Sequence, residues 1–125
     1  MDLEQGLTGD ATLVVNEADT AQAFGSGDVA VLATPRVIAL CEEATNQALQ
    51  GRLPDGCTSV GVQVRLDHVM PSGLGAEVVA EAKLEKIAGR KLIFTVAAHE
   101  GRCLVAAGRV TRVVVDIQQF LAKTR

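Results

Sequence analysis

The sequence predicts an α+β fold in which one long helix is wrapped by a curved antiparallel β-sheet. Residues 33–49 place apolar side chains at helical spacing, behind a helix-start signal at Thr34-Pro35. Residues 60–115 instead alternate apolar and polar side chains in runs that glycine-containing turns separate. The inward positions of these runs include small residues, which suit close approach of a helix to a sheet: Ala80, Ala82 and Ala98.

Length and composition favour a single domain spanning residues 1–125. Hydrophobic residues make up 48% of the chain, with three Phe and no Trp or Tyr, so Val, Leu, Ile and Ala must form the core. The net charge of -3, without a basic block, argues against nucleic-acid binding. No apolar run approaches the roughly 20 residues that span a bilayer. The acidic N-terminus has no signal-peptide pattern, so we expect a cytoplasmic protein.

The three cysteines predict neither a disulfide framework nor a metal site. Cys41, Cys57 and Cys103 are odd in number, and no pair has metal-ligand spacing. Cys41 lies within the apolar stripe of the predicted helix, where a buried, inert thiol is expected.

The predicted helix should begin with Thr34 as its N-cap and end near Gly51, a position suited to a left-handed residue. Pro35 needs no N–H in the first turn. On a helical wheel of about 100° per residue, one apolar stripe emerges. Its members are Val37, Ile38, Leu40, Cys41, Ala44, Ala48 and Leu49.

Two adjacent glutamates of this helix have different expected environments. Glu43 falls on the solvent side, whereas Glu42 falls at the edge of the apolar stripe. Glu42 is either a boundary residue whose carboxylate turns to water or a functional carboxylate facing whatever covers the helix.

Around the helix we expect one strand before it and four after it. The first should end at residues 12–15, and Gly25-Ser26-Gly27 reads as a flexible connection because it lacks the lysine of a phosphate-binding loop. The later strands are expected near residues 60–68, 77–85, 91–98 and 103–115, with Asp116 capping a short helix over 117–122.

His68 is the second informative position. The alternation of Val60, Val62, Val64 and Leu66 places it on the apolar, helix-facing side of its strand. It is either a core histidine bonded to a backbone carbonyl or a functional group.

Apolar residues at positions outside the inward alternation suggest dimerisation, by sheet extension or by face packing. These residues are Val79, Ile93, Val113 and Val114.

Three features together carry a family resemblance. First, Thr34 opens the helix and Glu42 follows eight residues later. Second, His68 ends an alternating strand and is followed by Val69-Met70-Pro71-Ser72-Gly73. Third, two hairpin segments follow, at residues 89–98 and 105–112. From about Ala11 to the C-terminal helix, the chain resembles hot-dog-fold thioesterases of the fluoroacetyl-CoA thioesterase-like group.

This resemblance implies a hot-dog fold, hydrolysis of an acyl-CoA thioester, and Thr34, Glu42 and His68 as the catalytic set. It also implies a homodimer, or a tetramer formed by two such dimers, with active sites at the subunit interface, and no cofactor beyond the CoA of the substrate. His68 would serve as the base, and backbone N–H groups at the helix start would bind the oxyanion. The lid that selects fluoroacetyl-CoA in that group does not map onto residues 19–32, so that specificity is not carried over.

Helix geometry constrains the catalytic set. Thr34 and Glu42 are separated by about 12 Å of helix rise. Either the substrate spans that distance, or each site draws residues from two subunits, which we favour.

Three other functions are compatible with this fold: an acyl-thioester hydratase, a non-catalytic acyl-CoA-binding protein and a DNA-binding regulator. Acyl-thioester hydratases of the same fold usually carry Asp and His five residues apart, whereas Asp67 and His68 are adjacent here. A non-catalytic acyl-CoA-binding dimer is a further alternative, and a DNA-binding regulator would need a basic helix-turn-helix segment. Five cationic residues are candidates for contact with the CoA phosphates, but we interpret each as an ordinary surface strand residue: Arg65, Arg90, Lys91, Arg109 and Arg112.

Overall fold

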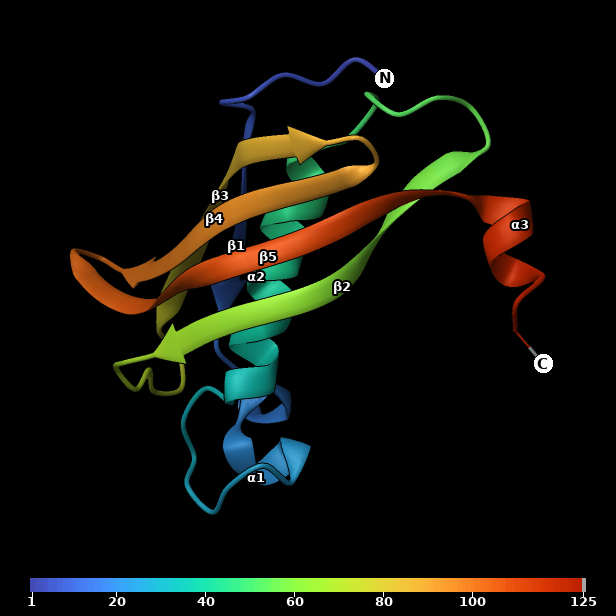
Figure 1. The fold of residues 1–125 in the computed structure, drawn as a ribbon. Coiled ribbons are helices and arrows are strands. Elements are labelled where there is room, and N and C mark those ends of the chain that lie inside the picture. The colour runs from blue at the N-terminus through green and yellow to red at the C-terminus, as the bar shows by residue number, and fades with distance from the viewer. Residues whose placement is uncertain (125) are drawn as a thin grey trace.

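The computed structural model describes residues 1–124 and confirms one long helix against a curved antiparallel sheet (Figure 1). The helix is α2 (Thr34–Ala48). Five strands follow the order β1-β3-β4-β5-β2, so β1 and β2 are the edges. The strands are β1 (Thr8–Val14), β2 (Cys57–His68), β3 (Glu77–Ala88), β4 (Lys91–Glu100) and β5 (Cys103–Asp116).

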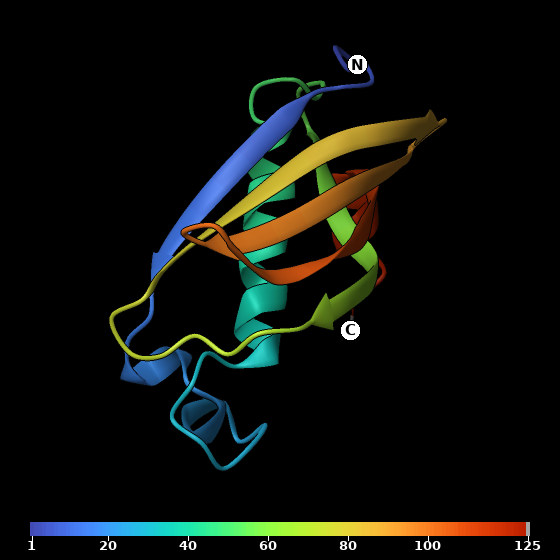
Figure 2. The ribbon, with the colours of Figure 1, turned by 90° about the vertical axis from the view of Figure 1, so that its left-hand side faces the viewer.

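Short helices flank this core. η1 (Glu17–Asp19) and α1 (Ala21–Phe24) precede α2 and lie near its N-terminal end (Figure 2). α3 (Ile117–Leu121) follows β5, and the Asp116 side chain accepts a hydrogen bond from the Gln119 N–H, which confirms the predicted cap. No helix within residues 1–124 is long and apolar enough to cross a membrane.

The core lies between α2 and the concave face of the sheet. The alternation predicted for β3 and β4 is confirmed, because their inward residues are buried: Val78, Ala80, Ala82, Leu84, Leu92, Phe94, Val96 and Ala98. On α2 the predicted stripe is buried apart from Ile38, which is half-buried. Gly51 has the predicted positive φ after the helix.

The predicted N-cap of α2 is wrong by one residue. Ala33, with an extended backbone, is the N-cap and makes no side-chain capping bond. Thr34 is instead the first helical residue, and its hydroxyl bonds to His68 across the fold. A tertiary contact therefore replaces the local capping bond that the sequence suggested.

A bulge in β2 changes which side chains face α2. The pairing with β5 shifts between Gly61 and Gln63. Val64 and His68 share the face of buried Val110 and Ala106, as predicted, but Val60 pairs with Val113 on the outer face. Val62 is exposed at the bulge. The prediction for Val60 and Val62 is wrong because an extra residue inverts the alternation.

Gly9 allows α2 to approach β1 closely. A Cβ at this position would overlap the backbone carbonyl of Ala44 and the backbone nitrogen of Ala48. Gly9→Ala should therefore lower the free energy of unfolding by about 1–3 kcal/mol, as overpacking does elsewhere. Urea unfolding would measure the effect, with Gly73→Ala as control because no atom lies near a Cβ there. Equal stability of the two variants would contradict this packing.

Candidate active site

Thr34 and His68 meet at the N-terminal end of α2. The Thr34 Oγ1 atom lies 2.8 Å from His68 Nδ1. Thr34 is the first residue of α2 and His68 the last of β2, so a helix start and a strand end bring together residues 34 positions apart. The pair also lies at the N-terminal end of α2, where Pro35 has no N–H and the Arg36 N–H donates to the Ala33 carbonyl at 3.0 Å. This leaves the Thr34 N–H as a backbone donor that can meet a negatively charged oxygen.

The environment of His68 favours a neutral imidazole. Burial lowers the pKa of His68 below its usual value of 6.5, and this effect outweighs the opposing influence of the Met70 backbone. The Nε2 atom is buried and has no hydrogen-bond partner among the described residues. One ring nitrogen is thus held by Thr34, and the other is available to a ligand.

An open groove of about 380 Å³ adjoins this pair. Its walls come from the loop before α2 and from the segment after β2, including Val29, Leu32, Val69 and Met70. Ser26 and Gly27 also line it, so the predicted flexible connection forms part of a candidate binding surface.

Asp19 fixes the loop wall to the helix. Its carboxylate accepts hydrogen bonds from Arg36 Nε at 3.2 Å and from the Asn16 N–H at 2.9 Å. Its backbone carbonyl accepts from the Ala33 N–H. These three contacts hold η1 and the residue before Thr34 in one arrangement.

Glu42 belongs to a second polar cluster, further along α2. Its side chain is 37% exposed, and Oε2 lies 3.7 Å from Arg112 Nη1. Glu43, by contrast, is 53% exposed at the side chain, which confirms the predicted solvent position. Arg112 is buried, and its guanidinium donates to Ser59 Oγ at 2.8 Å and to the Ser59 carbonyl at 3.0 Å.

Gly61 makes room for the Glu42 carboxylate. A Cβ at Gly61 would overlap Glu42 Oε2, so only glycine leaves the carboxylate where it is. Gly61 pairs with Arg112 across β2 and β5. Glu42, Gly61 and Arg112 thus share the concave face near the bulge.

Sequence analysis missed this second cluster. The interpretation of Arg112 as a surface strand residue is wrong. Arg112 is buried and faces inward, where it pairs with buried Leu92 on β4 and with Gly61 on β2. The signal was present in the alternation of β5, where Val110 and Val114 share its parity. Ser59, which binds Arg112, is also buried. Its inward orientation could not be predicted from the alternation of β2, because the bulge shifts the register between Gly61 and Gln63.

Within one chain, the structure joins Thr34 to His68 but not to Glu42. No hydrogen bond or ion pair connects Glu42 to either residue in the described part of the chain. Thr34, Ile38 and Glu42 follow a four-residue spacing along α2, which places them on neighbouring positions of one face.

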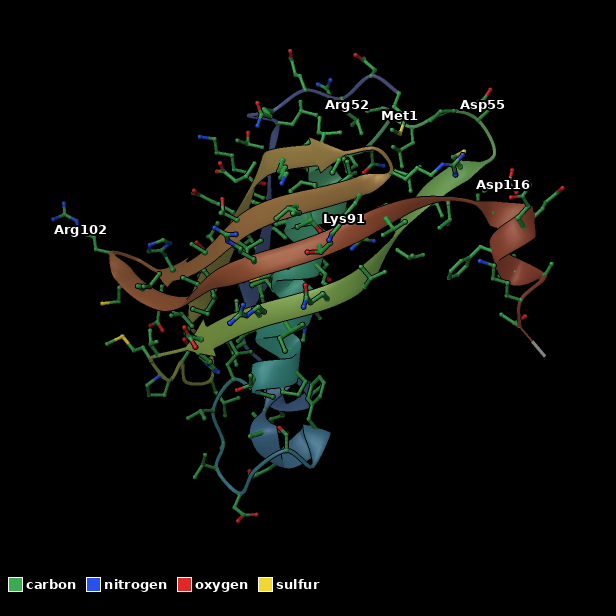
Figure 3. All side chains as sticks on the ribbon, viewed as in Figure 1. Met1, Arg52, Asp55, Lys91, Arg102 and Asp116 are labelled. Atoms are coloured by element: carbon green, nitrogen blue, oxygen red, sulfur yellow. The ribbon has the colours of Figure 1, made fainter. Side chains whose placement is uncertain are left out.

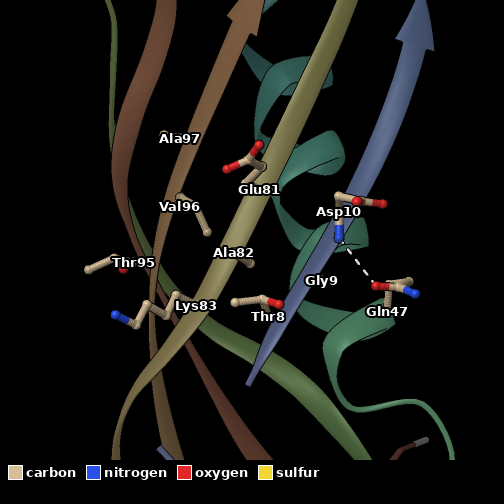
Figure 4. A pocket seen from close by; sticks show the side chains of 10 residues that line it. All are labelled: Thr8, Gly9, Asp10, Gln47, Glu81, Ala82, Lys83, Thr95, Val96 and Ala97. Carbon is tan, nitrogen blue, oxygen red and sulfur yellow. Dashed lines mark hydrogen bonds between the residues drawn. The ribbon is translucent and has the colours of Figure 1, made fainter. Parts of the chain in front are cut away.

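A second hollow, of about 550 Å³, lies away from this site (Figure 4). It is lined by residues of β1, β3, β4 and the last turn of α2, where the Asp10 N–H donates to Gln47 Oε1 at 3.2 Å. None of Thr34, Glu42 or His68 lines it. Its charged residues, Asp10, Glu81 and Lys83, are of mixed sign and favour no single class of ligand.

The expected burial of Cys41 is confirmed. Cys41 is fully buried, and burial, with Glu42 as a smaller cause, raises the pKa of its thiol to about 11. A thiol with that pKa is a poor nucleophile. No cluster of three or more His, Cys, Asp or Glu within residues 1–124 is arranged to hold a metal ion.

The architecture defines this chain as a hot-dog-fold protein. A solved hot-dog-like protein from Thermanaerovibrio acidaminovorans superposes with a TM-score of 0.87 at 22% identity, over 95% of this chain and 88% of that one. This match confirms the predicted fold.

The family follows from sequence. Residues 15–118 match the family model described as fluoroacetyl-CoA-specific thioesterase. The fluoroacetyl-CoA thioesterase of Streptantibioticus cattleyicolor is 32% identical over 95 residues, 76% of this chain and 68% of that protein. A solved fluoroacetyl-CoA thioesterase superposes with a TM-score of 0.91 at 26% identity, covering 98% of each chain. The chain belongs to the fluoroacetyl-CoA-specific thioesterase family, a family of thioester hydrolases, as the resemblance predicted.

Proposed function

We propose that this chain hydrolyses the thioester of a short acyl-CoA in the groove beside Thr34 and His68. The observation that carries the proposal is the 2.8 Å contact between the Thr34 hydroxyl and a half-buried imidazole whose pKa lies below 6.5. A neutral histidine bonded to a hydroxyl is a base in position to accept its proton. The relative's name and a solved variant in complex with fluoroacetate and CoA support a short acyl group.

In this mechanism the thioester carbonyl lies at the start of α2. The Thr34 N–H and the positive end of the helix dipole stabilise the oxyanion, and His68 removes a proton from the attacking group. Attack by Thr34 would leave an acyl group on its hydroxyl, whereas attack by water would not. Mass spectrometry of quenched reactions distinguishes the two routes, because an acyl-enzyme adds the mass of the acyl group. No cofactor beyond the CoA of the substrate is needed.

We further propose a homodimer formed through the edge of β2. This strand has twelve residues and no neighbouring strand on its outer side within residues 1–124, and long open edges are normally covered. Antiparallel pairing over its full length would place Gly61 of the partner subunit opposite Val64. That position is four residues from His68, whereas Gly61 of the same chain is seven residues away. The partner's Glu42, which contacts Gly61, would thereby approach the Thr34–His68 pair.

The defining experiment measures free-thiol release over a panel of acyl-CoAs, from short to long, with aromatic and halogenated members included. We expect hydrolysis of short acyl-CoAs, and the preferred member names the substrate. Binding without hydrolysis across the panel would favour the non-catalytic acyl-CoA-binding alternative. Light scattering of the same preparation reports whether the protein is a dimer or a tetramer.

Activity should depend on pH through His68. The neutral imidazole is the active form, so kcat/KM should stay level near neutrality and fall as pH drops through a pKa below 6.5. His68→Gln should lose this acid limb together with most activity. A limb centred above 6.5 would contradict the assignment of His68 as the base.

A further inference from the structure

Two rows of charged side chains cross the outer face of the sheet, the convex face turned away from α2. Residues directly opposite on neighbouring strands share a face, so the strand pairing defines each row. The acidic row contains, from β1 to β2, Asp10, Glu81, Ala97, Ala107 and Asp67. The basic row, two residues away on each strand, contains Thr8, Lys83, Thr95, Arg109 and Arg65. Figure 3 is viewed from this side, with the strands in front of α2.

The charges of both rows lack partners within the described chain. The charged side chains are all exposed: Asp10, Glu81, Asp67, Lys83, Arg109 and Arg65. No ion pair within residues 1–124 involves any of them. Two cross-strand neighbours even carry like charges, because Asp10 lies opposite Glu81 and Arg65 lies opposite Arg109. Like charges in directly opposite positions destabilise a sheet, so compensation by another molecule is expected.

The centre of the outer face permits another sheet to approach. β4 is the middle strand of the five and β5 lies beside it. Their contributions to the acidic row, Ala97 and Ala107, are small, half-buried and paired with each other. Sheets packed face to face lie about 10 Å apart, which small central residues allow. Glu81 and Lys83, on one flank, line the open hollow of about 550 Å³, so side chains of another molecule have room there (Figure 4).

A second copy of this chain carries the complementary pattern. A two-fold axis that lies in the plane of contact, crosses the strands and passes between the rows places each row on the opposite row of the copy. Glu81 then faces the partner subunit's Lys83, and Arg65 faces the partner subunit's Asp67. We infer that the outer face binds a second copy of this chain through these two rows. Each contact occurs twice, as an isologous interface requires.

The charge pattern selects this orientation over the other aligned one. A two-fold axis parallel to the strands would place Asp67 on the partner subunit's Asp10, and Lys83 on the partner subunit's Arg109. Like charges would then meet, at a cost that disfavours the arrangement. The selected contact uses the face of the sheet and leaves both edges free. It is therefore independent of the proposed β2-edge dimer and of thioester hydrolysis.

Two charge reversals test the contact. In Glu81→Lys, positions 81 and 83 are both cationic, and in Lys83→Glu both are anionic. Each variant alone should repel its own copy, so light scattering should give half the wild-type mass. An equimolar mixture should recover the wild-type mass, because the cationic pair of one chain faces the anionic pair of the other. A contact confined to one chain cannot produce this recovery.

The matched control is Glu77→Lys. Glu77 is also exposed on β3, but it pairs with Val14 outside both rows. The same change of charge on the same strand should therefore leave the mass unchanged. Circular dichroism checks the fold of each variant. If a reversal at β3 unfolds the chain, Arg65→Glu and Asp67→Arg repeat the exchange on β2.

The outcomes separate this inference from the proposed function. Half the mass in each reversal variant, with recovery only on mixing, supports the contact. A monomeric wild-type protein, an unchanged mass in both reversal variants, or no recovery on mixing overturns it. Thiol release from acyl-CoA should be the same in all these variants, because none of the changed residues lines the groove beside His68. Loss of wild-type hydrolysis would overturn the proposed function alone.

Discussion

Replacing His68 with alanine is expected to lower kcat/KM by about 10²- to 10⁴-fold, the range associated with loss of a general base. The variant removes the imidazole that lies 2.8 Å from the Thr34 hydroxyl, so no group remains to accept the proton. Thiol release from the preferred acyl-CoA measures the loss. The KM should change less than kcat, because His68 is one of eleven residues that line the groove and the other ten remain.

The second histidine of the chain supplies the control. His99 lies on β4, pairs with Val79 and Leu104, and does not line the groove. His99→Ala should keep wild-type kcat/KM. If His68→Ala is poorly folded by circular dichroism, His68→Gln retains most of the volume and removes the base. Full activity in a folded His68→Gln variant would exclude His68 from the mechanism.

Replacing Glu42 with alanine should lower kcat by about 10²-fold or more if its carboxylate acts on the thioester or on water. Its neighbour Glu43 is the matched control, because the two glutamates share helix and charge but Glu43 points to solvent and pairs with Arg36. Glu43→Ala should leave kcat unchanged. Equal activity of the two variants would mean that Glu42 takes no part in catalysis and serves only as an ion-pair partner of Arg112.

Mixed dimers show which subunit supplies Glu42. A dimer of one His68→Ala chain and one Glu42→Ala chain contains an intact site only if each site combines His68 of one subunit with Glu42 of the partner subunit. Refolding the two inactive variants together should then restore about a quarter of wild-type activity by random pairing. No recovery in confirmed mixed dimers would mean that each chain supplies both residues.

The Asp19–Arg36 contact explains why a groove persists beside such a short loop. The carboxylate and guanidinium hold η1 against the first turn of α2, and the Thr20–Leu32 and Val31–Gly73 bridges hold the remainder. The loop wall is therefore tied at both ends to the elements that carry Thr34 and His68. This arrangement gives residues 19–32 a defined role despite their small apolar content.

Much of the fold and several candidate site residues could be predicted from the sequence. Periodicity of 3.6 residues predicted α2, and period-two alternation predicted the buried faces of β3 and β4, because burial on one face imposes those spacings. The alternation along β2 predicted that His68 faces the helix. The family resemblance added Thr34 and Glu42 to the candidate catalytic set.

How these residues meet depends on contacts between elements that are distant in the sequence. A local rule made Thr34 an N-cap, but its hydroxyl bonds to His68 instead. The bulge at Val62 reverses the facing of Val60 and turns Ser59 inward to bind Arg112. These features depend on strand register and on contacts between residues distant in sequence. Local periodicity predicts neither the register nor these contacts. The helix rise between Thr34 and Glu42, however, was already set by the sequence, because backbone geometry alone determines it.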